Sequence, residues 1–124
     1  LFRFLDAKPR ELLDAMLTKG LNAPLASSCG RLFDAVAAAV GLCREHAAYE
    51  GQGAVLLEAQ VDPEVLEHED ELLGYPFAIP RLKCSRLPYI EPLVMWSALL
   101  GDLVLDTPVP VMAARFHKGL AKAI

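Results

Sequence analysis

The sequence predicts a mostly α-helical fold with a small β element around residues 75–90. Apolar residues recur at helical spacing over most of the chain, which is typical of helices that bury one face. Proline, serine, aspartate and glycine border these stretches, at the places where helices begin and end. The segment around 75–90 differs because prolines and aromatic residues interrupt a partial alternation of apolar and polar residues, a pattern typical of short, irregular strands.

Two helices are expected in the first third of the chain. The first covers residues 9–20, where a proline suits the first helical position and a glycine ends the helix. The second covers residues 27–41, with Ser27 or Ser28 as its N-cap and Gly41 at its end.

Four further helices are expected in the rest of the chain. They cover residues 54–60, 62–73, 91–104 and 107–124. Asp62 precedes a proline and Thr107 begins the last stretch, so both are expected to act as N-caps.

Helical spacing also predicts which side chains are buried. On the helix over 91–104, the inward face is expected to carry Leu93, Trp96 or Val94, Leu100 and Leu103. One shared core is expected to contain Leu32, Phe33, Val36, Val40, Trp96, Leu100, Met112, Phe116 and Leu120.

The length of 124 residues is sufficient for one domain with a core, so a single helical domain over 1–124 is expected. The chain begins at Leu1 without a methionine and its last helix reaches Ile124 without a stop signal, so we expect an excerpt of a larger protein. Hydrophobic residues make up 54% of the chain, above the roughly 45–50% of an average domain. An exposed apolar face is therefore expected to be covered, for example in a homo-oligomer.

Charge and cysteine content restrict the partners and the compartment. A net charge of -4 without a cluster of Lys and Arg argues against nucleic acid. Apolar runs stay well short of the roughly 20 residues of a membrane helix, so no membrane is expected. Cys29, Cys43 and Cys84 are odd in number and widely spaced, which is typical of reduced thiols in a cytoplasmic protein.

The sequence does not predict a metal site or a catalytic residue within this chain. His46 and His68 each lie near glutamates, but neither group supplies the three or four convergent ligands that a metal needs. His117 is expected at the edge of the last helix's apolar stripe, without an assigned role.

Arg31 and Asp34 are charged residues at the start of an otherwise apolar helix. They are three residues apart and therefore share a face of that helix. Two interpretations stay open: the pair solvates the start of the helix, or Asp34 contacts a ligand. A glycine-containing loop at 49–53 precedes the next helix, and such loops are suited to bind phosphate or another anion.

The chain resembles the HypF family, the carbamoyltransferases that mature [NiFe] hydrogenases, in four ordered segments: SSCGRLFDAVAAAVGLC, YEGQGA, YPF and ARFHKGLA. The resemblance covers most of the chain. It implies the helical part of one lobe of an actin/Hsp70-like ATP-binding fold, within a C-terminal module that is similar to the TsaD enzymes.

The resemblance also implies an activity for the parent protein. HypF enzymes use carbamoyl phosphate and ATP to carbamoylate the C-terminal cysteine of an acceptor, HypE. For this chain it implies ATP as the cofactor of the parent, a HypE-like acceptor as its partner, and a metal ion that residues outside this chain supply. The isolated chain is expected to be inactive.

The motifs shared with TsaD-like enzymes imply the site residues. The nucleotide-contacting Asp of that pattern matches Asp34, with Arg31 as its neighbour, and its Gly-Gly pair matches Gly51 and Gln52. The position of its nucleotide-contacting Glu is Leu56 here. The chain is thus expected to contribute one wall of a nucleotide site.

Two other identities are compatible with the spacing of the residues alone. The chain could belong to a TsaD-like or O-carbamoyltransferase relative, or it could be a helical interaction module without a ligand. The serine-led SSCGRLFDAV and the YEGQ segment favour the HypF family.

Overall fold

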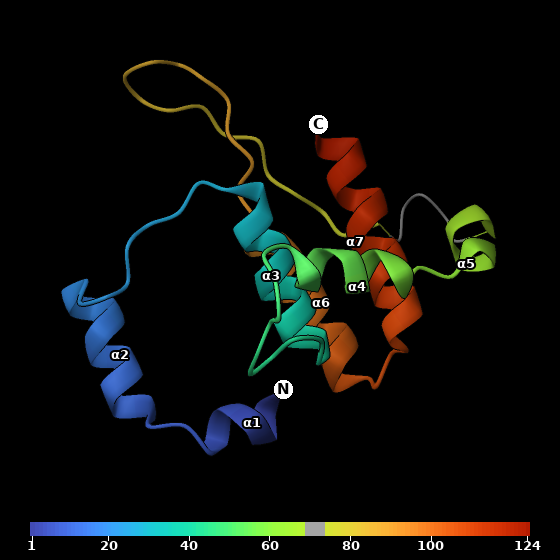
Figure 1. Cartoon of the computed structure of the whole chain (residues 1–124). Helices are drawn as coiled ribbons and strands as arrows, with labels where there is room; N and C mark the ends of the chain where they lie inside the picture. Colours follow the sequence, from blue (N-terminus) through green and yellow to red (C-terminus); the bar gives the residue numbers. More distant parts are fainter. Residues whose placement is uncertain (69–73) are drawn as a thin grey trace. The chain divides into compact units, whose positions relative to one another are not determined.

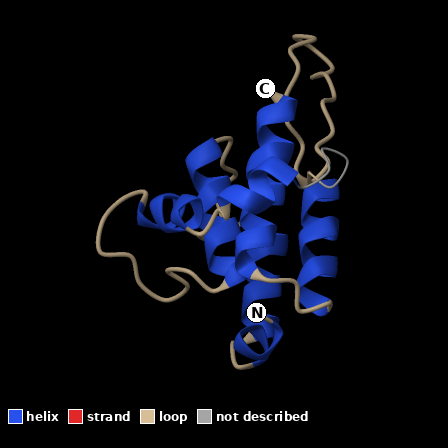
Figure 2. Cartoon of the chain, turned by 90° about the vertical axis from the view of Figure 1, so that its right-hand side faces the viewer, coloured by secondary structure: helices blue, strands red, loops and turns tan. Residues whose placement is uncertain are grey.

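The computed structural model describes residues 1–68 and 74–124. They divide into two compact units, Leu1–Leu56 and Leu57–Ile124. Figure 1 traces the chain, and Figure 2 shows the described residues as helices joined by loops. The predicted mostly α-helical fold is confirmed, and the single domain over 1–124 stays a prediction.

Unit 1 contains three whole helices and the start of a fourth: α1 (Phe2–Asp6), α2 (Arg10–Lys19), α3 (Cys29–Val40) and α4 (Gln52–Ala59). The helix α2 is the one expected over 9–20, and Gly20 closes it with a left-handed φ of 65°, a conformation that costs glycine little. The helix α1 was not expected, because five residues are too few to show a helical period.

The buried part of unit 1 lies on α3. Its N-cap is Ser28, one of the two expected serines, although no side-chain hydrogen bond completes this cap. Arg44 satisfies carbonyl groups at the other end, since its Nε and Nη2 donate to the oxygens of Ala38 (2.9 Å) and Ala39 (3.1 Å). The same guanidinium lies 5.2 Å from the ring centroid of Phe4 and so links α1 to the end of α3.

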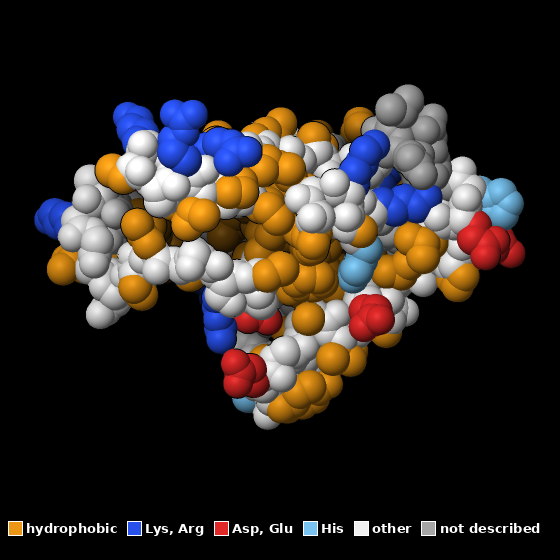
Figure 3. Space-filling model, turned by 90° about the horizontal axis from the view of Figure 1, so that it is seen from above, with side chains coloured by type: hydrophobic (Ala, Val, Ile, Leu, Met, Phe, Trp, Pro, Cys, Tyr) orange, Lys and Arg blue, Asp and Glu red, His pale blue; other side chains and the backbone are white. Residues whose placement is uncertain are grey.

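The helix α2 keeps its apolar face exposed. Leu12, Leu13 and Leu17 are 57%, 40% and 71% exposed, and the helix has no buried residue. Hydrophobic side chains are also prominent on the surface drawn in Figure 3. The expectation that an apolar face is covered in a homo-oligomer stays a prediction.

Unit 2 contains α5 (Pro63–His68), α6 (Leu93–Val104) and α7 (Val109–Ala123). The predicted cap of α5 is confirmed, because the carboxylate of Asp62 accepts the N–H of Glu64 at 2.9 Å. Residues 69–73 of the helix predicted over 62–73 lie outside the described residues.

The buried face of α6 differs from the predicted one. Met95 and Leu99 are fully buried, whereas Leu93 and Leu100, expected to point inward, are 68% and 36% exposed. The physical reason is that α6 is apolar around almost its whole circumference, so spacing alone does not distinguish neighbouring faces.

The buried face of α7 is the predicted one. Met112, Phe116 and Leu120 are buried there, as Val36 is on α3. The remaining predicted core residues are half-buried apart from Leu100: Leu32, Phe33, Val40 and Trp96. The expectation of one shared core spans both units and stays a prediction.

Thr107 does not cap α7 with its side chain as expected. The N-cap is Pro108, and the hydroxyl of Thr107 donates to Asp102 at 3.3 Å instead. A hydroxyl caps a helix by accepting backbone N–H groups, and Pro108 and Pro110 at the start of α7 have none to donate.

The predicted β element is confirmed as a hairpin arm, residues 78–91. Ala78 and Glu91 exchange two backbone hydrogen bonds of 3.2 and 2.9 Å, and a second antiparallel bridge joins Arg81 to Pro88. The turn closes through Leu82, whose N–H donates to the carbonyl of Leu87 at 2.9 Å. In Figure 1 this arm projects away from the helices of unit 2.

A polar cluster ties the chain before the arm to α6 and α7. Asp102 accepts hydrogen bonds from the Tyr75 hydroxyl at 2.7 Å and from Nη1 of Arg115 at 2.9 and 2.8 Å. Burial, reinforced by the hydrogen bond to Asp102 and its charge, raises the pKa of Tyr75 far above its ordinary value. The Tyr75 hydroxyl therefore stays protonated while unit 2 is folded.

This raised pKa predicts a loss of stability at alkaline pH. The unfolded chain releases the Tyr75 proton near pH 10, about the ordinary tyrosine value, while the folded chain retains it. The unfolded state then binds fewer protons, so the free energy of unfolding falls by up to about 1.4 kcal/mol per pH unit above that point. We expect Tyr75→Phe to remove this slope in urea unfolding measured at a series of pH values. Tyr89→Phe, on the exposed arm, is the control, and an unchanged slope in Tyr75→Phe would contradict the prediction.

Within residues 1–68 and 74–124, no helix combines the length and the apolar character needed to cross a membrane.

Candidate functional site

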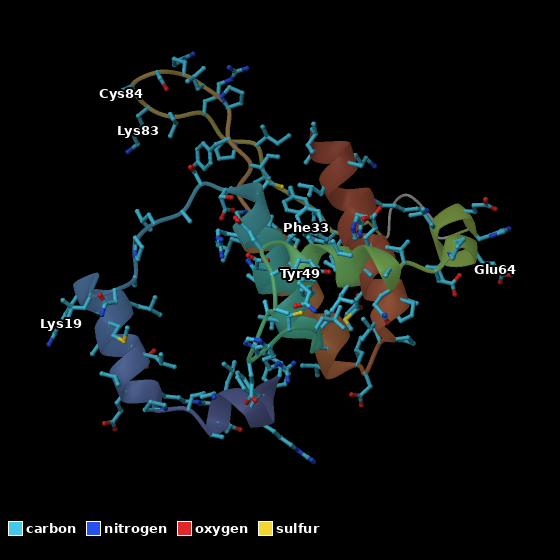
Figure 4. All side chains as sticks on the ribbon, viewed as in Figure 1. Lys19, Phe33, Tyr49, Glu64, Lys83 and Cys84 are labelled. Carbon is cyan, nitrogen blue, oxygen red and sulfur yellow. The ribbon has the colours of Figure 1, made fainter. Side chains whose placement is uncertain are left out.

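Unit 1 contains an open pocket of about 590 Å³ between the first half of α3 and the loop that leads into α4. It is lined by Arg31, Asp34, Cys43, Ala47, Tyr49, Glu50, Gly51 and Gly53. Figure 4 shows Tyr49 on that loop, close to the ribbon of α3. A volume of this size is within the range of small-molecule sites, roughly 300–1,000 Å³.

The charged side of the pocket is formed by one cation and two carboxylates. Nη1 of Arg31 lies 3.1 Å from Oδ2 of Asp34, and its Nη2 lies 4.0 Å from Oε1 of Glu50. Helical spacing places Arg31 and Asp34 on one face of α3, and the loop before α4 brings Glu50 close to Arg31. The three side chains are 64%, 37% and 95% exposed, so water screens the pairs and a ligand can displace them at low cost.

Gly53 allows α4 to approach Asp34 closely. A Cβ atom at position 53 would lie 3.2 Å from the Cβ of Ala37 and 3.4 Å from Oδ1 of Asp34. The first distance is tighter than an ordinary contact and the second is an ordinary one, so a side chain here would crowd Ala37. Glycine at position 53 therefore lets α4 pack closely on α3 beside Asp34.

Gly51 makes the turn that directs α4 toward the pocket. Its φ is 81°, a left-handed value that strains residues with a Cβ. The helix begins at the next residue, Gln52, whose N–H donates to the carbonyl of Tyr49 at 3.3 Å, and Gly53 of its first turn lines the pocket. The N–H groups of this first turn lie at the positive end of the helix. Their partial positive charge favours an anionic ligand.

The structure brings three of the four predicted residues together, namely Arg31, Asp34 and Gly51. Gln52 is not part of the pocket lining, because its side-chain oxygen accepts the N–H of Ala48 at 2.6 Å and braces the loop. Leu56 is half-buried on α4 and also lies outside the lining.

Cys43, Tyr49 and Gly53 are pocket residues to which the sequence assigned no site role. The sequence predicts only that Gly53 belongs to the loop at 49–53. Cys43 returns to the pocket because the chain turns there with a positive φ of 48°. No local sequence pattern predicts that the chain comes back to the pocket at Cys43. Tyr49, next to a glutamate and a glycine, could have indicated that its loop lines a pocket.

Histidines do not contribute to this pocket. Neither His46 nor His117 is part of its lining. Nδ1 of His117 lies 2.7 Å from the carbonyl of Ala113 on its own helix. In the part of the chain that the structure describes, no group of three or more His, Cys, Asp or Glu side chains is arranged to hold a metal ion.

Comparison with known proteins identifies the family. The family model described as "Carbamoyltransferase, Kae1-like Domain, second subdomain" matches residues 2–124. The chain is 35% identical over 105 residues to carbamoyltransferase HypF of Synechocystis, covering 83% of this chain and 12% of that protein. It is 53% identical over 57 residues to carbamoyltransferase HypF of Rhodobacter capsulatus, covering 46% and 8%.

A third relative, carbamoyltransferase HypF2 of Cupriavidus necator, is 57% identical over 47 residues, which is 38% of this chain and 6% of that protein. No solved structure matches the chain significantly. The chain spans about a tenth of the length of these relatives. It belongs to the HypF carbamoyltransferase family and corresponds to the second subdomain of the Kae1-like domain.

Proposed function

We propose that the protein containing this chain transfers a carbamoyl group, and that the pocket of unit 1 forms one wall of its ATP site. Carbamoyl phosphate would be the donor, and the acceptor would be the C-terminal cysteine of a HypE-like protein in the maturation of [NiFe] hydrogenase. The match of residues 2–124 to the carbamoyltransferase model supports the reaction class. As the chain spans only about a tenth of its relatives, we assign the catalytic groups and the metal ligands to other parts of the protein, which we place in the cytoplasm.

The observation that carries the ATP assignment is the meeting of Arg31, Asp34 and Gly51 in one pocket. A carboxylate can accept hydrogen bonds from the two hydroxyls of a ribose. A guanidinium and the N–H groups at the start of a helix favour the negative charge of phosphates. The pocket thus offers groups of the right kind for both the sugar and the phosphates of a nucleotide.

Asp34→Ala in the full-length protein tests this assignment. Loss of hydrogen bonds to a charged acceptor costs about 1.5–3 kcal/mol, so we expect ATP affinity in calorimetry to fall about tenfold or more. The melting temperature should change little, because an exposed ion pair contributes only about 0–1 kcal/mol to stability.

Asp14→Ala is the matched control, since Asp14 is an exposed aspartate of α2 in the same unit. It should leave both ATP affinity and melting temperature unchanged. Unchanged affinity in Asp34→Ala together with a large fall in melting temperature would make Asp34 structural. The pair with Arg31 would then only solvate the start of α3.

The isolated chain is proposed to be inactive. Phosphoryl and carbamoyl chemistry require that donor, nucleotide and metal be held together, and one open wall leaves a nucleotide mostly in water. Calorimetry of the 124-residue chain should therefore detect ATP binding that is weaker than that of the full-length protein.

A further inference from the structure

Charge is strongly segregated along the middle of the chain. Residues 45–72 contain nine Asp and Glu and no Lys or Arg, whereas residues 73–90 contain three Lys and Arg and no Asp or Glu. The first segment includes α5, and the second includes most of the hairpin arm. Within the described part of unit 2, α5 with Glu64 and Glu67 and the arm with Arg81, Lys83 and Arg86 therefore carry opposite charge.

The cationic surface is the tip of the hairpin arm. Lys83 and Arg86 are exposed there, and Figure 4 shows Lys83 and Cys84 at the tip. Within the described residues, neither of the two cations forms an ion pair. Leu82 and Leu87, 49% and 61% exposed, add apolar contact area beside them.

The anionic surface is α5. Glu64 and Glu67 are exposed and three residues apart, so they lie on one side of the helix with Cβ atoms roughly 5–6 Å apart. Leu66, which precedes Glu67 in the sequence, is 40% exposed. The carboxylate of Asp62 is occupied by the cap of the helix, but among the described residues no cation pairs with Glu64 or Glu67.

The two surfaces cannot meet within one molecule. Figure 4 places Lys83 and Glu64 at opposite ends of unit 2, and α5 is packed against α7. We propose that they meet between molecules: the tip of the hairpin arm of one copy docks on α5 of a second copy. Two cations then face two carboxylates, and the leucines of both surfaces pack beside them.

This contact has a defined symmetry. Each copy offers one arm and one acidic helix, so the contact is heterologous and assembly continues until it closes into a ring or grows as a chain. Exposed charge pairs are screened by salt, with a Debye length of about 10 Å at 0.1 M and about 3 Å at 1 M. The association should therefore be stronger in dilute buffer than in concentrated salt.

Charge reversal tests the contact by sedimentation in dilute buffer. The wild-type chain should sediment above its monomer mass of 13.5 kDa. Lys83→Glu/Arg86→Glu in the arm and Glu64→Lys/Glu67→Lys in α5 should each lower the association constant about tenfold or more, because like charges then face each other. An equal mixture of the two variants should restore association, since each arm finds a helix of opposite charge.

Arg3→Glu/Lys19→Glu is the matched control, because it changes the net charge as much as the arm variant does but on exposed residues of α1 and α2. It should associate like the wild type. A wild-type chain that is monomeric at all concentrations would overturn the proposal. So would association that salt and charge reversal leave unchanged, since this would point to the apolar face of α2. Binding of a single-stranded oligonucleotide by the arm, in place of self-association, would equally overturn it.

Discussion

Gly119→Ala is expected to lower the free energy of unfolding of unit 2 by about 3 kcal/mol, at the upper end of the usual cost of overpacking. Gly119 is buried in α7, and the chain at Tyr75 crosses directly over it. A Cβ at this position would clash with the carbonyl oxygen of Tyr75 and lie 2.8 and 2.9 Å from its N and C atoms. Backbone atoms cannot move aside like the tip of a side chain, and the N–H of Tyr75 is held by the carbonyl of Arg115 at 3.0 Å.

Gly101→Ala is expected to raise, not lower, the free energy of unfolding of the same unit. Gly101 lies within α6, and a Cβ there would have no heavy atom within 4 Å. Alanine should therefore stabilise this helix by about 0.5–1 kcal/mol. Hydrogen exchange of the α6 and α7 amides measures both effects within unit 2. If the α6 and α7 amides were equally protected from exchange in the two variants, the backbone at Tyr75 would be able to move away from position 119. This would contradict the prediction.

Asp102→Ala is expected to cost about 3–5 kcal/mol, the range for breaking a buried ion pair. The side chains of Asp102 and Arg115 are only 12% and 20% exposed, so little water replaces the lost carboxylate. The substitution also removes the acceptor of the Tyr75 and Thr107 hydroxyls. Thermal unfolding followed by circular dichroism should show a clear fall in the melting temperature of unit 2.

Arg31→Ala is the control for Asp102→Ala, because it breaks an ion pair of similar length that is exposed to solvent. Arg31 and Asp34 are 3.1 Å apart, compared with 2.8 Å for Arg115 and Asp102. Since exposed pairs contribute about 0–1 kcal/mol, Arg31→Ala should leave the melting temperature nearly unchanged. A similar small effect of Asp102→Ala would mean that the cluster is dispensable for folding.

Local patterns predicted the helices of this fold where a specific residue begins or ends them. Gly20, Gly41 and Asp62 act at helix ends through their own backbone or side chain, so a short stretch of sequence contains the necessary information. The rotation of α6 was not predictable in this way. Its buried face depends on which neighbours pack against it, and its apolar residues suit several faces equally.

Like the fold, the candidate site could be predicted only in part from the sequence. Arg31 and Asp34 are one helical turn apart, and the pair follows from that spacing. Gly53 closes on Asp34 from another helix, a contact between elements that no spacing rule describes. The same holds for Asp102 and Arg115, which lie on different helices and are 13 residues apart.

In the proposed nucleotide site, Asp34 and Arg31 would have different tasks, because Asp34 lies beside Gly53 and Arg31 extends into solvent. The carboxylate of Asp34 lies beside Gly53 of α4, is 37% exposed, and belongs to a short side chain with less conformational freedom to lose than an arginine. Arg31, 64% exposed, is held only by charge and can swing to meet an incoming anion. In the proposed site, binding would have to order one long side chain, at a cost of about 0.5–1.5 kcal/mol, and one short side chain that loses less freedom.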